Sequence, residues 1–230
     1  MREVLTKGQL KSGESFHIQR LTMNDIPKIN RLQDTVVEKL HDSNMLVTLS
    51  DSEIQHILLD GGLFIGVFIK ERLIACRAFL IPDIDDPEHL GYDARIPKGE
   101  FPEVIYSEIS MVDPSYRGNR LQTFMGKILI ELVKQSNFKY VLTTVAPNNI
   151  PSLKDKFALG MRIVHVKEKY GGKLRFILYR HVHKTSELPV KDERLVPIDN
   201  MKLQEKLLKL GYCGIEIQAN GKIKYEKRGD

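Results

Sequence analysis

Residues 104–125 read Val104-Ile105-Tyr106-Ser107-Glu108-Ile109-Ser110-Met111-Val112-Asp113-Pro114-Ser115-Tyr116-Arg117-Gly118-Asn119-Arg120-Leu121-Gln122-Thr123-Phe124-Met125. The first nine residues are largely apolar and β-branched, which predicts a buried strand. Asp113-Pro114-Ser115 ends that strand, because proline cannot donate to a ladder and Asp and Ser favour turns. Beyond Gly118 the apolar residues recur with helical spacing, so a helix with one apolar face follows: Leu121, Phe124, Met125, Ile128, Leu129 and Leu132.

Four residues, Arg117-Gly118-Asn119-Arg120, join this strand to this helix. The start of a helix has unpaired N–H groups and partial positive charge, so it attracts anions. Gly118 permits a tight turn, and two arginines add charge suited to phosphate oxygens. Two interpretations are open: a turn that holds phosphate, or an ordinary loop with solvated arginines.

Composition sets limits on the class of protein. The chain has 230 residues, 42% of them hydrophobic and 28% charged, which is ordinary for a soluble globular protein. Its net charge of +5 mildly favours anionic partners but is too diffuse to indicate nucleic-acid binding. Its two cysteines, Cys76 and Cys213, indicate a reducing compartment. With no signal peptide and no apolar run long enough for a membrane span, we expect a cytoplasmic protein.

The segments before residue 104 predict one strand, two helices and a hairpin. We expect a strand at 16–21, a helix that starts near Asp25 and ends near Leu40, a second helix from Ser50 to Gly61, and paired strands at 63–69 and 73–81. Residues 1–15 carry no clear pattern. Residues 82–103 also lack a pattern and are rich in acids, which could attract a cationic amine or simply form a solvated loop.

The segments after residue 133 continue the alternation of strands and helices. We expect a strand at 140–145, a helix from Asn149 to Gly160, and a hairpin around Gly171-Gly172. From about Lys184 a polar linker leads to a helix at 201–210 and a last hairpin around Asn220-Gly221. The predicted fold class is α/β (α+β), with a mixed, mostly antiparallel central sheet flanked by helices. The predicted domains are residues 1–183 and a C-terminal appendage, residues 184–230.

Two motifs resemble those of the GCN5-related N-acetyltransferase (GNAT) family. The segment 112–122 is similar to motif A, in which Arg or Gln, two residues, Gly, one residue, and Gly or Ala form a loop that binds the pyrophosphate of acetyl-CoA. Arg117 matches the first position, whereas Arg120 and Gln122 stand where the two small residues are expected. The segment 144–152, followed by Leu159-Gly160-Met161, resembles motif B, in which an Asn precedes a helix. The order of elements across residues 16–183 is also similar to that of the family.

The resemblance implies a set of residues that bind acetyl-CoA. Main-chain groups at the end of the strand would bind the pantetheine amides, backbone amides of the turn and first helical residues would bind pyrophosphate, and Asn149 would bind the pantetheine arm. The implied residues are Ser110, Met111, Val112, Arg117, Gly118, Asn119, Arg120, Leu121, Gln122, Thr123, Asn149 and Ser152.

Glu108 is the candidate catalytic base. It lies within an apolar strand, where a carboxylate is costly unless it has a role, and its spacing before Tyr116-Arg117-Gly118 resembles that of a strand carboxylate in some family members. The alternative is a structural carboxylate that pairs with an arginine or lies on a solvated face. Many relatives have a tyrosine in the motif B helix that acts as the general acid and protonates the departing thiolate. Residues 154–157 contain no tyrosine, so Lys156 or Tyr170 are the remaining options for this role. His181 and His183 have no third ligand at suitable spacing, so we expect no metal site.

The sequence thus predicts an N-acetyltransferase that transfers the acetyl group of acetyl-CoA to a primary amine by direct attack in a ternary complex. The alternative is a non-catalytic acyl-CoA-binding or regulatory module with a degenerate motif. The acceptor, a small molecule, amino acid or peptide, is not specified, and a homodimer is left open. Nucleic acid and membrane are not expected as partners.

Overall fold

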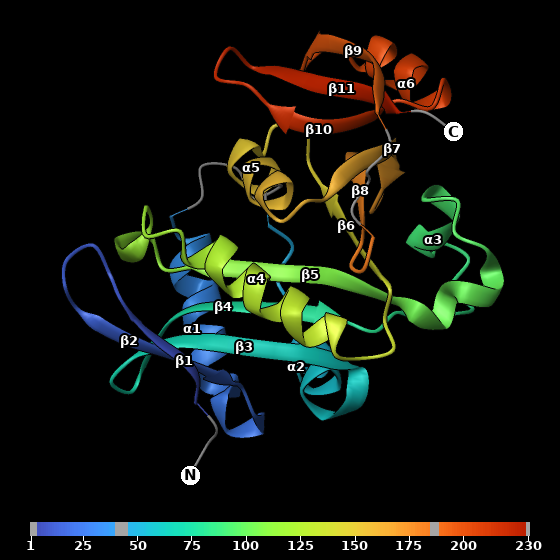
Figure 1. Cartoon of the computed structure of the whole chain (residues 1–230). Coiled ribbons are helices and arrows are strands. Elements are labelled where there is room, and N and C mark those ends of the chain that lie inside the picture. Colours follow the sequence, from blue (N-terminus) through green and yellow to red (C-terminus); the bar gives the residue numbers. More distant parts are fainter. Residues whose placement is uncertain (1–3, 40–45, 185–188, 229–230) are drawn as a thin grey trace. The chain divides into compact units, whose positions relative to one another are not determined.

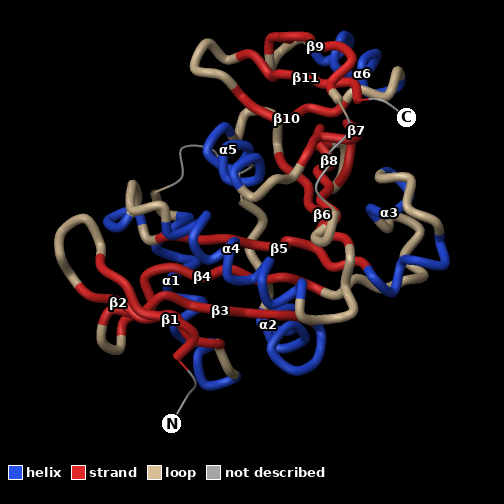
Figure 2. The backbone as a smooth tube through the Cα atoms, viewed as in Figure 1, coloured by secondary structure: helices blue, strands red, loops and turns tan. Residues whose placement is uncertain are grey.

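The computed structural model describes residues 4–39, 46–184 and 189–228, which form two compact units. Unit 1 consists of Met1–Pro82 and Ile105–Leu132, and unit 2 of Asp83–Val104 and Val133–Asp230. Each unit contains an open antiparallel sheet with helices beside it (Figures 1 and 2). The predicted fold class, a mostly antiparallel sheet flanked by helices, is confirmed.

The sheet of unit 1 has the strand order β1-β2-β3-β4-β5, and all of these neighbours are antiparallel. The strands are β1 (Val4–Gln9), β2 (Ser15–Arg20), β3 (Gly62–Ile69), β4 (Arg72–Leu80) and β5 (Val104–Val112). The predicted hairpin is therefore confirmed as β3 and β4. Strand β1 was not expected, because no residue in it is fully buried and its sequence shows no apolar alternation.

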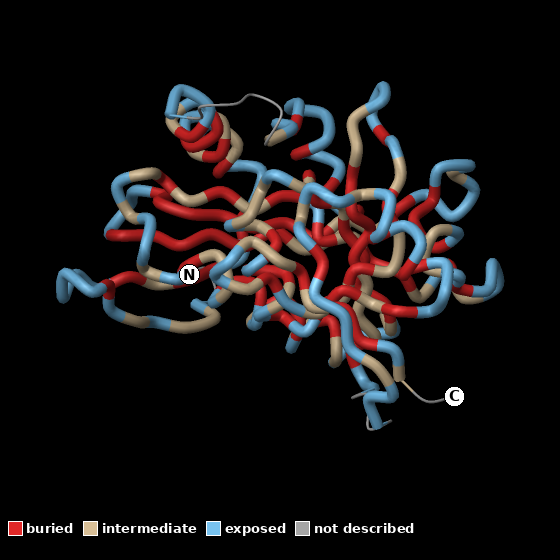
Figure 3. The backbone as a smooth tube through the Cα atoms, turned by 90° about the horizontal axis from the view of Figure 1, so that it is seen from above, coloured by how far each residue is buried: buried red, intermediate tan, exposed pale blue. Residues whose placement is uncertain are grey.

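One face of this sheet packs against two predicted helical segments. These are the 3-10 turn η1 (Met23–Asp25) with α1 (Ile26–Val37), and α2 (Asp51–His56), which continues into the π-helical turn η3 (Ile57–Gly61). Leu40, the expected end of the first helix, lies outside the described residues. Alternate strand residues such as Phe64, Cys76 and Ala78 form a core with Ile29 of α1 and Ile54 of α2. The longest runs of buried residues are in β3 and β4, and buried residues are drawn red in Figure 3.

The strand–turn–helix segment forms as predicted. After β5 comes a short 3-10 turn, η5 (Pro114–Tyr116), and then α4 (Leu121–Lys134), which crosses in front of β4 and β5 in Figure 1. Phe124 differs from the expectation of a fully buried face. Its side chain is 37% exposed and meets Phe16 edge-to-face, with 6.1 Å between ring centroids. Helical spacing therefore predicted which face of α4 is apolar. It did not predict that Phe124, which contacts β2, stays partly exposed at the edge of that face.

The sheet of unit 2 has the order β6-β8-β7-β10-β11-β9, again with antiparallel neighbours. Its elements are β6 (Tyr140–Val145), α5 (Ile150–Ala158), β7 (Arg162–Lys169), β8 (Lys173–His181), β9 (Val190–Pro197), α6 (Met201–Lys209), β10 (Cys213–Ile217) and β11 (Lys222–Arg228). All were predicted except β9, which lies in the segment expected to be a linker. Seven of its eight residues are not buried, so its sequence lacks the apolar alternation of a half-buried strand.

The acidic segment before β5 is structured rather than a plain loop. It contains α3 (Leu90–Asp93) and the 3-10 segment η4 (Lys98–Glu103). Glu88 accepts from Lys169 at 2.8 Å, and Asp93 lies 3.1 Å from the Lys167 ammonium. These two carboxylates therefore bind lysines of β7, whereas Asp83 and Asp85 of the same segment are exposed.

Candidate functional site

Glu108 is the extra residue of a β-bulge. On β4, the consecutive residues Ala78 and Phe79 pair with Ile109 and Ser107 of β5, so the pairing passes over Glu108. A bulge redirects the side chain of its extra residue and is common beside functional sites. The Glu108 side chain is exposed, although both flanking residues, Ser107 and Ile109, are buried. The bulge thus allows a carboxylate in an apolar strand to reach solvent.

The surroundings of Glu108 raise its pKa. The largest cause is the partial loss of hydration to neighbouring protein atoms, and the second is the negative charge of Glu53. Glu53 belongs to the capping box of α2, where its carboxylate accepts from the Ser50 hydroxyl and the Ser50 N–H, each at 2.7 Å. These hydrogen bonds lower the pKa of Glu53. The ionised Glu53 is therefore a fixed negative charge that acts on Glu108, and Glu108 takes up a proton more readily than an ordinary glutamate does.

The turn from β5 to α4 contains two residues in the left-handed region. Gly118 has φ +80° and Arg120 has φ +58°. Arg120 occupies the position where the resembled motif has glycine, and it adopts a backbone conformation that glycine takes without strain. The carbonyl of Arg120 accepts the first helical hydrogen bond of α4, from the N–H of Phe124 at 3.0 Å. The backbone at position 120 therefore has a conformation typical of glycine, although the residue there is arginine.

Two side chains of this segment, Asp113 and Asn119, link the turn to the neighbouring hairpins and to its own backbone. Asp113 accepts from Arg72 of β4 at 2.7 Å and from the Ser115 N–H at 2.9 Å. Asn119 accepts from the Lys11 N–H at 2.9 Å and donates to the Tyr116 carbonyl at the same distance. The path of the chain between β5 and α4 is thus fixed at both ends.

The guanidinium of Arg77, in the middle of β4, is completely buried. It donates to the Gln122 carbonyl in the first turn of α4 and to the Ser107 hydroxyl on β5, each at 3.0 Å. Sequence reasoning missed Arg77, Arg72 and Lys11. For Arg77 a signal was available, since it is the only charged residue in the apolar run from Leu73 to Ile81.

Three polar groups beside the turn are available to a ligand. Arg117 and Arg120 are exposed, and neither guanidinium makes an ion pair or hydrogen bond with another described residue. The Ser110 hydroxyl is buried and has no hydrogen-bond partner in the described part of the chain. A buried hydroxyl without a partner and two uncompensated cations fit a ligand that offers both acceptors and negative charge.

The remaining predicted residues lie in unit 2. Asn149 caps α5, because its side-chain oxygen accepts from the Ser152 N–H at 3.1 Å. This hydrogen bond gives both residues a structural role that the sequence did not assign to them. Where relatives carry a tyrosine, α5 holds the buried pair Lys156 and Asp155, 3.4 Å apart. The Tyr170 hydroxyl lies 3.2 Å from the Thr144 hydroxyl.

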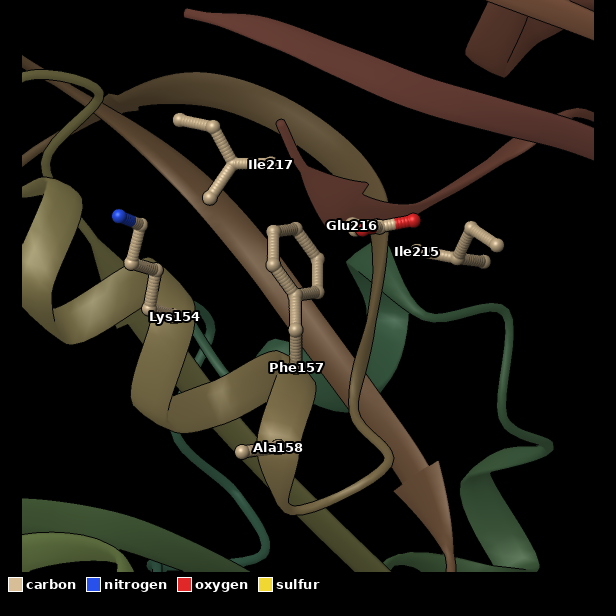
Figure 4. A pocket seen from close by; sticks show the side chains of 6 residues that line it. All are labelled: Lys154, Phe157, Ala158, Ile215, Glu216 and Ile217. Atoms are coloured by element: carbon tan, nitrogen blue, oxygen red, sulfur yellow. The ribbon is translucent and has the colours of Figure 1, made fainter. Parts of the chain in front are cut away.

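A hollow of unit 2 is lined by other residues. It measures about 370 Å³ and is lined by Lys154, Phe157 and Ala158 of α5 and by Ile215, Glu216 and Ile217 of β10 (Figure 4). None of the predicted site residues lines it. Among the residues that the structure describes, no group of His, Cys, Asp and Glu could hold a metal ion, and no helix is long and apolar enough to cross a membrane.

Comparisons with known proteins were made by sequence and by structure. No family model matches the sequence, and no curated protein matches it. Among solved structures, an N-acetyltransferase from Staphylococcus aureus Mu50 is similar, with 24% identity, a TM-score of 0.53, and coverage of 74% of this chain and 99% of that one.

Two further solved structures have the same architecture. The ribosomal-protein-S18-alanine N-acetyltransferase from Escherichia coli has 13% identity and a TM-score of 0.55, with 75% of this chain and 97% of that chain covered. A putative acetyltransferase from Salmonella typhimurium, solved with its cofactor acetyl-CoA, has 13% identity and a TM-score of 0.53, with 74% and 96% covered. The chain therefore has the fold of the GNAT acetyltransferases.

Proposed function

We propose that the protein is an N-acetyltransferase that uses acetyl-CoA as cosubstrate and a primary amine as acceptor. The observation that carries the proposal is the left-handed backbone of Arg120, which stands at the glycine position of the resembled motif within a matching fold. A non-glycine residue in this region costs energy, and at this position the conformation suits a turn whose amides bind an anion.

The residues near the Arg117–Arg120 turn fit the cosubstrate. The backbone N–H groups from Gly118 to Thr123 would bind pyrophosphate, and the guanidinium groups of Arg117 and Arg120 would add charge. Main-chain groups of Ser110, Met111 and Val112 would bind the pantetheine amides, with the unpartnered Ser110 hydroxyl as a further contact. Asn149 and Ser152 would bind the pantetheine arm, as the resemblance implies.

Glu108 would act as the general base. It would take a proton from the substrate ammonium, after which the amine nitrogen attacks the thioester carbonyl carbon. The carbon–sulfur bond then breaks, the acetyl group stays on nitrogen, and coenzyme A leaves as the thiolate, which takes up the second proton that the nitrogen loses. A raised pKa suits this role, because a base is most effective when its pKa approaches the working pH.

A second candidate is a non-catalytic acyl-CoA-binding module. It is favoured by the larger side chains of Arg120 and Gln122 at the motif's small positions, and by the buried Lys156–Asp155 pair where relatives have a tyrosine. Such a module would bind acetyl-CoA and leave it intact.

Release of free thiol from acetyl-CoA separates the two candidates. The protein would be incubated with acetyl-CoA and a panel of polyamines, amino acids, aminoglycosides and peptide N-termini, with acetyl-CoA binding measured in parallel. Thiol release with at least one amine, absent in the Glu108→Gln variant, would support the enzyme. Binding without turnover on any amine would favour the module, and absence of binding would contradict both.

A further inference from the structure

Arg77 is an unusual residue for the interior of a sheet. Its side chain is completely buried, and the flanking residues Cys76 and Ala78 are also completely buried. Placing a guanidinium there is costly unless its N–H groups are used, so its contacts call for a functional explanation. Two of these contacts reach different elements: the Ser107 hydroxyl on β5 and the Gln122 carbonyl on α4.

The contact with Gln122 falls at the start of α4, which follows a residue whose side chain cannot accept a hydrogen bond. Helices commonly begin with Ser, Thr, Asp or Asn, whose oxygen accepts from the first-turn N–H groups. Arg120 precedes α4 and has no acceptor on its side chain, and its backbone is left-handed. The first turn of α4 therefore depends on other groups to keep its orientation, and Arg77 donates directly to it.

We propose that Arg77 is a positioning residue that fixes the first turn of α4 in the orientation that binds the pyrophosphate of acetyl-CoA. This inference rests on the proposed function. One rigid guanidinium joins β4, β5 and α4, so the N–H groups of Leu121, Gln122 and Thr123 keep a constant direction relative to the end of β5. Its charge lies beneath the same turn and adds to the field that favours an anion there.

The test compares Arg77→Met with Arg77→Lys, with Ser107→Ala and with one control, Ile29→Val. Methionine fills the space without charge or donors, whereas lysine keeps the charge but cannot serve both partners as a fork. Ser107→Ala removes the contact to β5 and leaves the contact to α4. Ile29→Val loosens the completely buried core on the other face of the sheet without touching either contact.

Two measurements are made on each full-length variant. Amide hydrogen exchange at Phe124, Met125 and Gly126 reports the order of the first turn of α4. Michaelis constants and affinities are measured for acetyl-CoA and for acetylpantetheine, which lacks the pyrophosphate. We expect Arg77→Met to speed exchange at these amides and to raise the Kd for acetyl-CoA, each by about tenfold, with little change for acetylpantetheine.

Arg77→Lys should fall between the wild type and Arg77→Met, and it supplies the comparison if the methionine variant does not fold. Ser107→Ala, which breaks one of the two contacts, should show a smaller loss than Arg77→Met, and Ile29→Val should leave both measurements within about threefold of the wild type. Unchanged exchange at the three amides in Arg77→Met and Arg77→Lys would overturn the inference, as would equal losses for acetyl-CoA and acetylpantetheine. A wild-type protein that does not bind acetyl-CoA would contradict the proposed function, and the exchange data would still decide whether Arg77 fixes the turn.

Discussion

The β-bulge at Glu108 places a carboxyl group with a raised pKa at the surface of β5. The bulge in β5 gives its carboxyl group access to solvent, and the protein around it together with Glu53 raises its pKa. The folded state therefore disfavours the charged form of Glu108 relative to the unfolded chain. This group favours folding fully only below the ordinary pKa of a glutamate, and that contribution is lost as the pH rises through the higher pKa of the folded state.

The variant Glu108→Gln should separate activity from stability. Glutamine keeps the shape but cannot take a proton, so we expect acetyl transfer to fall by about 10²–10⁴-fold. The melting temperature at pH 8 should not decrease, because a disfavoured charge has been removed. Turnover assays and thermal unfolding check the two outcomes. Full activity in this variant would remove Glu108 from the mechanism.

The variant Glu53→Gln should change the pH profile. Glutamine can still complete the capping box of α2, but it removes the negative charge that raises the pKa of Glu108. We therefore expect the acidic limb of the kcat/KM profile to move to lower pH. Asp51→Asn, in the same helix, is the matched control and should leave the limb in place. An unmoved limb in Glu53→Gln would mean that another group controls it.

Among the elements, the strand–turn–helix segment was the most predictable. Its periodicity changes from strand-like to helical across Gly118, and both elements formed with the expected limits. What the sequence did not reveal was the bulge at Glu108 and the left-handed Arg120. A bulge depends on the pairing with β4, and backbone strain at Arg120 is maintained by contacts from distant residues, so neither leaves a local pattern.

Other elements show the same dependence on neighbours. Strands β1 and β9 were missed because exposed edge strands need no apolar alternation. The sequence shows that Glu88 and Asp93 belong to an acidic segment. It does not show which residues they bind, because their lysine partners lie on β7. Arg117 could be proposed from a motif in the sequence, whereas Arg77 could not, because its contacts depend on the packing of β4 against β5 and α4.

Arg120→Gly tests whether the turn is strained. Glycine adopts the observed φ of +58° without a steric penalty, so we expect the free energy of unfolding to increase by about 0.5–1 kcal/mol. Arg117→Gly is the matched control. It removes a guanidinium from the same turn, but the φ of Arg117 is −60°, so this variant should not stabilise the protein. Urea unfolding measures both, and equal effects would argue against strain at Arg120.

On the scale of the molecule, unit 2 is completed by its C-terminal strands. Gly214 of β10 pairs with Ile163 of β7 and with Tyr225 of β11. An added Cβ at Gly214 would lie 3.0 Å from the Ile163 side chain and 3.2 Å from that of Ile223. The close approach of these strands thus depends on a glycine, and the residues after 189 contribute to the same sheet as β7.

Gly214→Val should weaken this pairing. The valine side chain would collide with both isoleucines, and we expect a loss of about 1–3 kcal/mol in the free energy of unfolding. Gly99→Val is the control, because an added Cβ at Gly99 has no atom within 4 Å. Chemical denaturation, with hydrogen exchange at β7 and β10, locates the loss. A stability equal to that of the control would mean that β10 can shift to accommodate the larger residue.

The ion pair between Glu88 and Lys169 has a consequence for biosynthesis. The two residues are 81 positions apart in the chain, and the whole of β5 and α4 is made between them. At ordinary rates of translation the ribosome needs about 4–16 s to make that length. Unit 1 has all of its residues once Leu132 leaves the ribosome, whereas residues 83–104 wait for partners not yet made. For those seconds the acidic segment of the nascent chain must avoid contacts with the wrong partners. Its negative charge helps, because a charged segment stays hydrated.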